Sequence, residues 1–197
     1  MTLSSEYWEN RYQQRNEPWD IGKPAPPLVS FFESTDAPHP GIMAVPGCGK
    51  GHEALYCAQK GFTVYGFDFA PSAITNATGR ALTAGINATF LERDIFSLGE
   101  EFPGHFDYVL EHTCFCAINP DQRAEYVQII HQILKPKGAL IALFFTHSRA
   151  GGPPFGTNLE ELECLFDPYF TVQFLEKPSN SIAGRENDEL LAYLVKI

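Results

Sequence analysis

A glycine-rich turn is the first segment of the sequence that could do chemistry. The run Val45-Pro46-Gly47-Cys48-Gly49-Lys50-Gly51 follows a short apolar stretch and precedes a helical one. Glycines in this position let the backbone turn tightly and approach a ligand at a helix N-terminus. The spacing matches neither a P-loop nor the G-x-G-x-x-G dinucleotide motif. The turn is therefore either a ligand contact or a simple strand-to-helix connection.

Two acidic residues at the ends of later apolar runs favour the ligand. Asp68 follows the run at 62–67 and lies 21 residues after Gly47. A carboxylate there accepts hydrogen bonds from both hydroxyls of a ribose, although it could instead cap the helix that begins at Pro71. Asp94 ends the next run, where an adenine would lie. An acidic chain with these features and no triphosphate clamp indicates S-adenosylmethionine.

Strands alternate with helices along most of the chain. Such alternation predicts a parallel sheet with right-handed crossovers, a doubly wound α/β fold. The last two strand-like runs have no helix-length connector, so we expect an antiparallel hairpin at the sheet edge. The expected strands are 41–45, 62–67, 88–94, 106–110, 139–145, 170–176 and 190–197, and the expected helices include 52–60, one opening at 71, 120–134 and 158–166. Pro136-Lys137-Gly138 is expected to separate helix from strand.

The first 40 residues differ from the rest in being rich in aromatic residues and proline. Trp8, Arg11, Tyr12 and Arg15 recur at spacings of three and four, which places them on one helix face if Ser5 caps a helix. This arm either packs its aromatics on the core or covers a ligand as a lid. We expect one domain over 1–197, with an arm at 1–40 and a Rossmann-like core at 41–197.

Charge and composition restrict the possible partners. Fourteen Lys and Arg against 24 Asp and Glu give a formal net charge of −10, and the basic residues are scattered. Nucleic acid and anionic membranes are therefore poor partners. The five cysteines lack the spacing of a disulfide framework, and the N-terminus has no apolar signal region. We expect a cytoplasmic monomer that acts on a small molecule.

Three motifs in order resemble those of the thiopurine S-methyltransferase family, and in particular its thiol and halide methyltransferase branch. They are the glycine turn, Glu111-His112-Thr113-Cys114-Phe115-Cys116-Ala117-Ile118-Asn119-Pro120, and Gly151-Gly152-Pro153-Pro154-Phe155. The resemblance runs from Trp8 to about Phe166. It implies a class I methyltransferase fold, a three-layer sandwich with strand order 3-2-1-4-5-7-6. It also implies S-adenosylmethionine as cofactor and S-adenosylhomocysteine as product.

The resemblance carries cofactor contacts to individual positions. It puts an aromatic cover over the cofactor, the glycine turn on its methionine part, acids on its ribose and adenine, and the fourth strand's end at the reacting centre. The cover would consist of Trp8, Tyr12 and Trp19, and the methionine part would contact Gly47, Cys48 and Gly49. The ribose would contact Asp68 with Phe69, and the adenine would contact Asp94 with Ile95. Glu111 with His112 would lie at the reacting centre.

His112 is the candidate catalytic residue. Only a few per cent of an ordinary thiol is ionised at neutral pH, so a base or cation near the sulfur would help. His112 is either that group or a positioning residue. Phe115 and Phe155 either form the dry wall of the acceptor pocket or are core aromatics. Animal thiopurine enzymes carry Arg where this chain has His112, a departure that argues against a heteroaromatic thiopurine as acceptor.

A metal site is the other chemistry that this segment suggests. His112, Cys114 and Cys116 share strand parity, so a continuing strand would project all three to one side. The sequence shows no fourth ligand, and structural zinc sites normally use a wider Cys spacing. We therefore expect no metal.

The function expected from these features is transfer of a methyl group to a small, soft nucleophile, namely a thiol, hydrosulfide or halide-like anion. Desolvation of the nucleophile and in-line alignment account for most of such a reaction. The alternatives are methylation of thiopurines, aromatic thiols or metalloids, and a non-catalytic sensor that binds the cofactor without turnover. A nicotinamide dehydrogenase is disfavoured by the glycine spacing.

Overall fold

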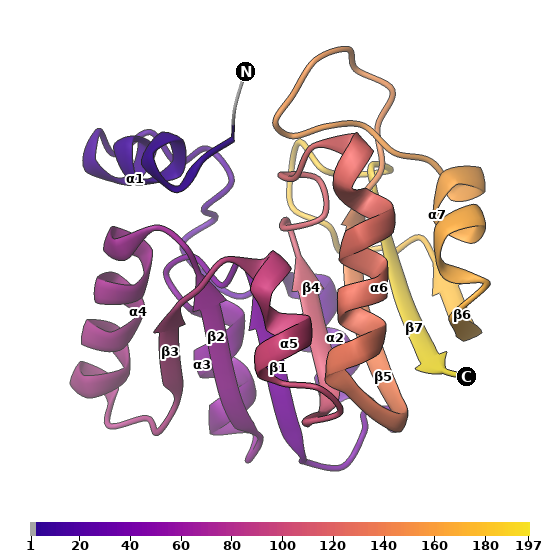
Figure 1. Cartoon of the computed structure of the whole chain (residues 1–197), viewed down its shortest axis with the longest axis horizontal. Coiled ribbons are helices and arrows are strands. Elements are labelled where there is room, and N and C mark those ends of the chain that lie inside the picture. Colours follow the sequence, from indigo (N-terminus) through magenta and orange to yellow (C-terminus); the bar gives the residue numbers. More distant parts are fainter. Residues whose placement is uncertain (1–2) are drawn as a thin grey trace.

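A seven-stranded sheet forms the centre of the protein (Figure 1). The structure, a computed structural model, describes residues 3–197. The spatial order β3-β2-β1-β4-β5-β7-β6 confirms the expected α/β fold and the strand order that the family resemblance implied. The strands are β1 (Ile42–Pro46), β2 (Thr63–Asp68), β3 (Thr89–Glu92), β4 (Phe106–His112), β5 (Leu134–Phe145), β6 (Phe170–Glu176) and β7 (Glu189–Lys196).

The direction of the strands determines where functional residues gather. Strands β1 to β5 pair in parallel, whereas β7 is antiparallel to both β5 and β6, as the terminal hairpin predicted. The carboxyl ends of β1, β2, β3 and β4 therefore meet at one edge of the sheet. This edge is where open α/β sheets bind ligands.

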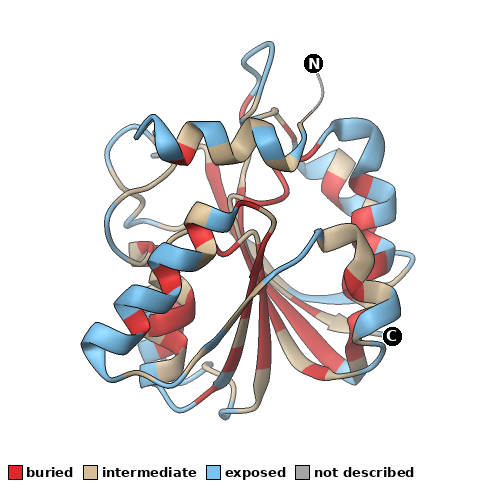
Figure 2. Cartoon of the chain, turned by 60° about the vertical axis from the view of Figure 1, so that its left-hand side comes forward, coloured by how far each residue is buried: buried red, intermediate tan, exposed pale blue. Residues whose placement is uncertain are grey.

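Helices cover both faces of the sheet. Leu28, Phe31 and Phe32 of α2 and Ala54 and Cys57 of α3 pack on one face. Residues of α5, α6 and α7 pack on the other, and in Figure 2 the buried segments, in red, lie mainly along the strands and on the helix stretches that face them. The helices are α1 (Ser5–Gln13), α2 (Pro26–Glu33), α3 (His52–Gln59), α4 (Pro71–Ala84), α5 (Leu98–Glu101), α6 (Arg123–Ile133) and α7 (Leu159–Phe166). Among the described residues no helix is long and apolar enough to cross a membrane.

The expected arm at 1–40 has two structural parts. Helix α2 belongs to the core layer, because its apolar face is buried against the sheet. Helix α1 instead lies across the top of the sheet, above α4 in Figure 1. The Glu9 carboxylate accepts hydrogen bonds from the Ser72 backbone N–H at 2.8 Å and from its hydroxyl at 2.6 Å. This contact fastens α1 to the first turn of α4.

Two local expectations need correction. The N-cap of α1 is Ser4, whose hydroxyl accepts from the Tyr7 N–H, while the Ser5 hydroxyl donates to the Phe69 carbonyl. The Pro136-Lys137-Gly138 segment does not separate α6 from β5. Helix α6 has already ended at Ile133, and the segment forms an irregularity inside β5, with Lys137 at φ 62°.

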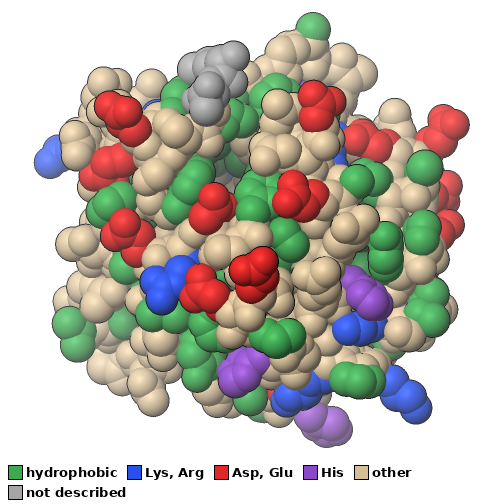
Figure 3. Space-filling model, in the orientation of Figure 1, with side chains coloured by type: hydrophobic (Ala, Val, Ile, Leu, Met, Phe, Trp, Pro, Cys, Tyr) green, Lys and Arg blue, Asp and Glu red, His purple; other side chains and the backbone are tan. Residues whose placement is uncertain are grey.

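Charged side chains are spread over the surface. Figure 3 shows acidic groups scattered over the face that carries α4, α5 and α6, with lysines and arginines separate from one another. This distribution fits the net charge of −10 and places no basic patch on that face.

Gly66 in β2 makes room for the packing beneath the glycine turn. A Cβ at this position would lie 2.6 Å from the Phe90 ring and 3.0 Å from the Cys48 sulfur. We predict that Gly66→Ala lowers the free energy of unfolding by about 1–3 kcal/mol, because a packed core resists added volume. The measurement is urea denaturation followed by circular dichroism.

Gly79 provides a matched control for this substitution. It lies exposed in α4, and a Cβ there would meet nothing within 4 Å. Gly79→Ala should raise the free energy of unfolding by up to about 1 kcal/mol, since alanine has the higher helix propensity. Equal effects of the two substitutions would contradict the steric role of Gly66.

Candidate active site

A cavity of about 530 Å³ lies at the edge of the sheet where the parallel strands end. Its walls come from α1, the segment after it, the loops that follow β1 to β5, and the loop between β6 and β7. Eight residues assigned from the sequence line it: Trp8, Tyr12, Trp19, Gly47, Asp68, Phe69, Asp94 and Ile95.

Asp68 is the most constrained polar group of this cavity. Its side chain is buried, and one carboxylate oxygen accepts the Gly49 N–H at 3.0 Å while the other accepts the Ala70 N–H at 2.9 Å. Burial raises the pKa of Asp68 to about 6, although the backbone hydrogen bonds act in the opposite direction. Each oxygen keeps a lone pair for a ligand, so the carboxylate fits a pair of ribose hydroxyls.

The glycine turn is shaped by close contacts on both sides. Gly47 has a φ of +59°, and a Cβ on it would lie 2.9 Å from the Cys114 sulfur. A Cβ on Gly49 would approach the Tyr12 hydroxyl to 3.1 Å. Side chains at these two positions would collide with the walls, so the turn presents bare backbone to the cavity.

Lys50 in this turn is held by acids of the segment after α1. Its ammonium group pairs with Glu17 and, at 2.9 Å, with Asp20. Despite partial burial, these carboxylates raise the pKa of Lys50. The charge that would clamp a phosphate in a nucleotide site is therefore used to fasten the N-terminal segment to the turn.

Three aromatic rings of the N-terminal segment form a cover over the cavity. The Trp19 ring stands edge-on to Trp8, with centroids 5.3 Å apart, and to Tyr12, with centroids 5.8 Å apart. Tyr12 is itself buried, and burial raises its pKa. These rings shield the glycine turn from solvent.

Asp94 and Ile95 line the cavity beyond β3. The Asp94 carboxylate accepts the Phe96 N–H at 3.0 Å, which starts a short 3-10 helix at Ile95–Ser97. This turn brings the segment to the wall of the cavity that Phe69 also lines.

Cys48, Gly49 and His112 lie on a smaller recess of about 50 Å³. It shares Tyr12 and Gly47 with the main cavity. The two spaces therefore meet at the glycine turn.

Glu111 lies beneath the site and does not line either space. One oxygen of its buried carboxylate accepts the N–H groups of Cys114 at 2.9 Å and Phe115 at 2.8 Å, and the other accepts the Tyr126 hydroxyl. Burial raises the pKa of Glu111, and these hydrogen bonds oppose that shift. The residue holds the loop after β4 in place.

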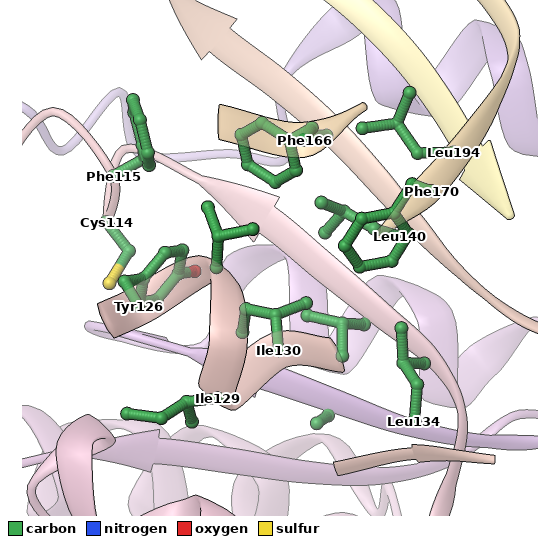
Figure 4. Packing of buried hydrophobic residues seen from close by; sticks show 14 of the residues in the cluster. Cys114, Phe115, Tyr126, Ile129, Ile130, Leu134, Leu140, Phe166, Phe170 and Leu194 are labelled. Atoms are coloured by element: carbon green, nitrogen blue, oxygen red, sulfur yellow. The ribbon is translucent and has the colours of Figure 1, made fainter. Parts of the chain in front are cut away.

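Phe115 and Phe155 lie outside the cavity wall. Phe115 packs in the core against Tyr126, Phe144 and Phe166, as Figure 4 shows for its neighbours Tyr126 and Phe166. The wall is formed instead by Phe145, Pro153 and Pro154. Motif spacing indicated two loops that line the cavity, but it did not show which of their side chains face inward.

Arg123 fixes the loop that carries Pro153, Pro154 and Phe155, and no pattern in the sequence indicated it. It is 1% exposed and donates to the carbonyls of Phe155 and Gly156 and to the Glu161 carboxylate. The Phe155 N–H donates in turn to the Cys116 carbonyl at 2.7 Å. This buried guanidinium thereby holds Pro153 and Pro154 against the cavity.

Two arginines line the cavity beside Phe145 and were also missed. The guanidinium carbons of Arg149 and Arg185 lie 5.3 and 5.6 Å from the centre of the Phe145 ring. Arg149 is mostly exposed and pairs with Asp188 at 2.7 Å. Only 11% of the Arg185 side chain is exposed, and its carboxylate partner Glu189 is 3.6 Å away. No pattern in the sequence marks these two residues, because they belong to irregular loops.

His112 is engaged at both ring nitrogens. Nδ1 lies 2.9 Å from a Glu53 oxygen, and Nε2 lies 3.2 Å from Nη1 of Arg185.

The two cysteines that share strand parity with His112 do not join it. Cys114 packs against Gly47, and the Cys116 thiol donates to the Thr113 carbonyl. Burial raises the pKa of Cys116 to about 12. Within residues 3–197 no three His, Cys, Asp or Glu side chains are grouped as metal ligands.

The cavity fits the cofactor that the sequence implied. A buried carboxylate at the end of β2 matches a ribose, and the bare backbone at Gly47 leaves room for an amino-acid part. The aromatic cover is apolar, and the nearby Lys50 ammonium is already paired with acids. The end of the cavity formed by the glycine turn, Asp68 and the aromatic cover therefore suits an adenosine ligand without phosphates.

Asp68 gives a direct test of cofactor binding. Asp68→Ala should weaken S-adenosylhomocysteine binding by about 10- to 100-fold, since each tenfold corresponds to about 1.4 kcal/mol. The measurement is isothermal calorimetry, with Asp36→Ala, an exposed acid after α2, as control. Unchanged affinity would contradict the ribose assignment.

The same carboxylate predicts a pH dependence. Its pKa of about 6 means that it is ionised and can accept two hydroxyls at pH 7.5, but is protonated at pH 5. S-adenosylhomocysteine affinity should therefore fall as the pH drops through 6, and this step should be smaller in Asp68→Ala. Calorimetry at several pH values between 5 and 8 measures both curves.

Known proteins resemble this chain over nearly its whole length. A family model described as thiopurine S-methyltransferase matches residues 3–192. A probable thiol methyltransferase 2 of Arabidopsis thaliana is 35% identical over 169 residues, 84% of this chain and 73% of that protein. Thiocyanate methyltransferase 1 of Brassica oleracea is 33% identical over 204 residues, 100% of this chain and 87% of that protein.

The fold also matches solved structures. The Burkholderia thailandensis 1,6-didemethyltoxoflavin-N1-methyltransferase with bound S-adenosylhomocysteine superposes with a TM-score of 0.74 and 19% identity, covering 98% of this chain and 87% of that one. Because the family model spans almost the entire sequence and two relatives exceed 30% identity, the chain belongs to the thiopurine S-methyltransferase family.

Proposed function

We propose that this protein methylates a small, soft anion: a thiolate, a hydrosulfide or a halide-like ion such as thiocyanate. The observation that carries the proposal is the presence of Arg185 and Arg149 in the same cavity as Asp68 and the glycine turn. The cofactor of the family is S-adenosylmethionine. When bound, it supplies an electrophilic methyl group attached to a sulfonium.

The charge at Arg185 favours an anionic acceptor. The side chain is mostly buried, so water screens its charge less than it screens that of Arg149. Guanidinium groups bind anions through N–H donors and are weakly hydrated, which suits a soft anion. Glu189, at 3.6 Å, compensates the charge without occupying a short hydrogen bond.

The apolar walls around these arginines support the same proposal. Phe145, which both guanidinium groups face, lines the cavity together with Pro153, Pro154 and Ile182. They exclude water from a bound anion, and a partly desolvated thiolate or halide is a stronger nucleophile. Alignment of the two reactants within one cavity contributes the remaining advantage. Such a site requires few groups that move protons.

The test of the proposal is the formation of S-adenosylhomocysteine, followed by mass spectrometry, with a panel of acceptors. Thiocyanate, hydrosulfide and iodide represent small anions, and thiophenol and a thiopurine represent aromatic thiols. We expect kcat/KM to be at least tenfold higher for one or more of the small anions. Preference for the aromatic thiols would contradict the proposed acceptor, and cofactor binding without turnover of any acceptor would favour a sensor.

Arg185 provides a second test. Arg185→Met should raise KM for thiocyanate at least tenfold, since the anion loses its buried cation, and this effect should exceed the loss of S-adenosylhomocysteine affinity that follows from the lost Trp19 contact. Lys177→Met is the control, because it removes the same charge from an exposed position in the same loop. Equal effects of the two variants would show that net charge alone attracts the anion.

A further inference from the structure

We infer that His112 and Glu53 are positioning residues: they hold the Arg185 guanidinium in the orientation that receives the acceptor. The inference rests on the proposed function, because it assigns the partners of the arginine that would bind the anion. It differs from a role for His112 as the base that deprotonates a thiol.

The hydrogen-bond chemistry of arginine determines the protonation of His112. A guanidinium has only donors, so the His112 Nε2 atom, 3.2 Å from Arg185 Nη1, must accept. The proton of the neutral ring then lies on Nδ1 and is donated to Glu53 at 2.9 Å. Because the Nε2 lone pair accepts the hydrogen bond from Arg185, Nε2 can take a proton from a thiol substrate only if that hydrogen bond breaks.

Glu53 is suited to be the last member of this chain of hydrogen bonds. Burial acts to raise its pKa, whereas the hydrogen bonds that it accepts from the His112 ring and from backbone N–H groups act to lower it. Glu53 therefore stays ionised as an acceptor for Nδ1–H. The same oxygen also accepts the Ala25 N–H at 3.1 Å, which fixes the carboxylate relative to the start of α2.

Arg185 is restrained on its outer nitrogens only. Nη1 contacts His112, and Nη2 donates to the Trp19 carbonyl at 2.9 Å. Glu189 lies 3.6 Å from Nη1. The Nε–H donates to none of the residues that the structure describes, so one edge of the guanidinium is left for an anion while the other nitrogens are held.

Two substitutions separate the two hydrogen bonds of His112. An asparagine can reach Glu53 with its amide N–H but is too short to offer an acceptor to Arg185. A glutamine places its amide oxygen near the position of Nε2 and can accept from Arg185. His112→Asn should therefore lose the positioning of Arg185, whereas His112→Gln should keep it.

The experiment measures KM and kcat for thiocyanate, an acceptor that needs no deprotonation. We expect His112→Asn to raise KM at least fivefold with kcat changed less than twofold, and His112→Gln to keep KM within twofold of the wild type. In an Arg185→Met background, His112→Asn should raise KM by less than a further twofold. S-adenosylhomocysteine affinity and thermal midpoint, measured for every variant, report on folding and on the cofactor site.

The outcomes distinguish the inference from its alternatives. Three outcomes would each overturn the positioning role. The first is an equal rise of KM in His112→Asn and His112→Gln, and the second is no rise in either variant. The third is that His112→Asn raises KM as much in the Arg185→Met background as it does in the wild type. If Arg185→Met alone leaves KM unchanged, the proposed anion site itself fails.

Nitrogen-15 NMR of the wild-type protein provides a measurement that needs no stable His112→Asn variant, with His112→Gln used only to assign the signal. We expect the neutral tautomer with its proton on Nδ1. A ring protonated on Nε2 would overturn the inference.

Discussion

The buried carboxylate of Asp68 is the contact on which the cofactor side of the structure depends. It joins the turn after β1, through the Gly49 N–H, to the start of α4, through the Ala70 N–H. A carboxylate removed from water needs such donors to remain ionised. The two backbone groups that stabilise the charge also fix the glycine turn relative to β2. The shape of the binding surface and the charge within it therefore have a common origin.

The part of the cavity around Arg185 is built differently, from segments distant in the sequence. Arg185 comes from the loop between β6 and β7, His112 from the end of β4, and Trp19 from the segment after α1. Arg123 performs a similar task for the loop that carries Pro153 and Pro154. Buried guanidinium groups organise the irregular loops here, whereas backbone pairing organises the sheet.

This difference explains how much of the molecule could be predicted from sequence. Apolar runs of strand length and the helices between them depend on local pattern, and the order of the seven strands followed from the family resemblance. The turn at Gly47 and the acid at Asp68 have fixed places relative to those strands, so they could be located.

The residues around Arg185 could not be located in the same way. Arg185 has no periodic or motif signal, and only tertiary packing brings it to Phe145 and His112. Strand parity did not bring His112, Cys114 and Cys116 to one side, because the chain leaves β4 through Thr113 with a φ of 64°. A single left-handed residue is enough to change which side chains face the cavity.

The bond from Arg185 to the Trp19 carbonyl connects access to the site with affinity for the acceptor. Trp19 belongs to the aromatic cover, so any movement of this segment that uncovers the cavity also withdraws an acceptor atom from the guanidinium. A covered cavity and a guanidinium held on both outer nitrogens therefore belong to one and the same conformation of this segment.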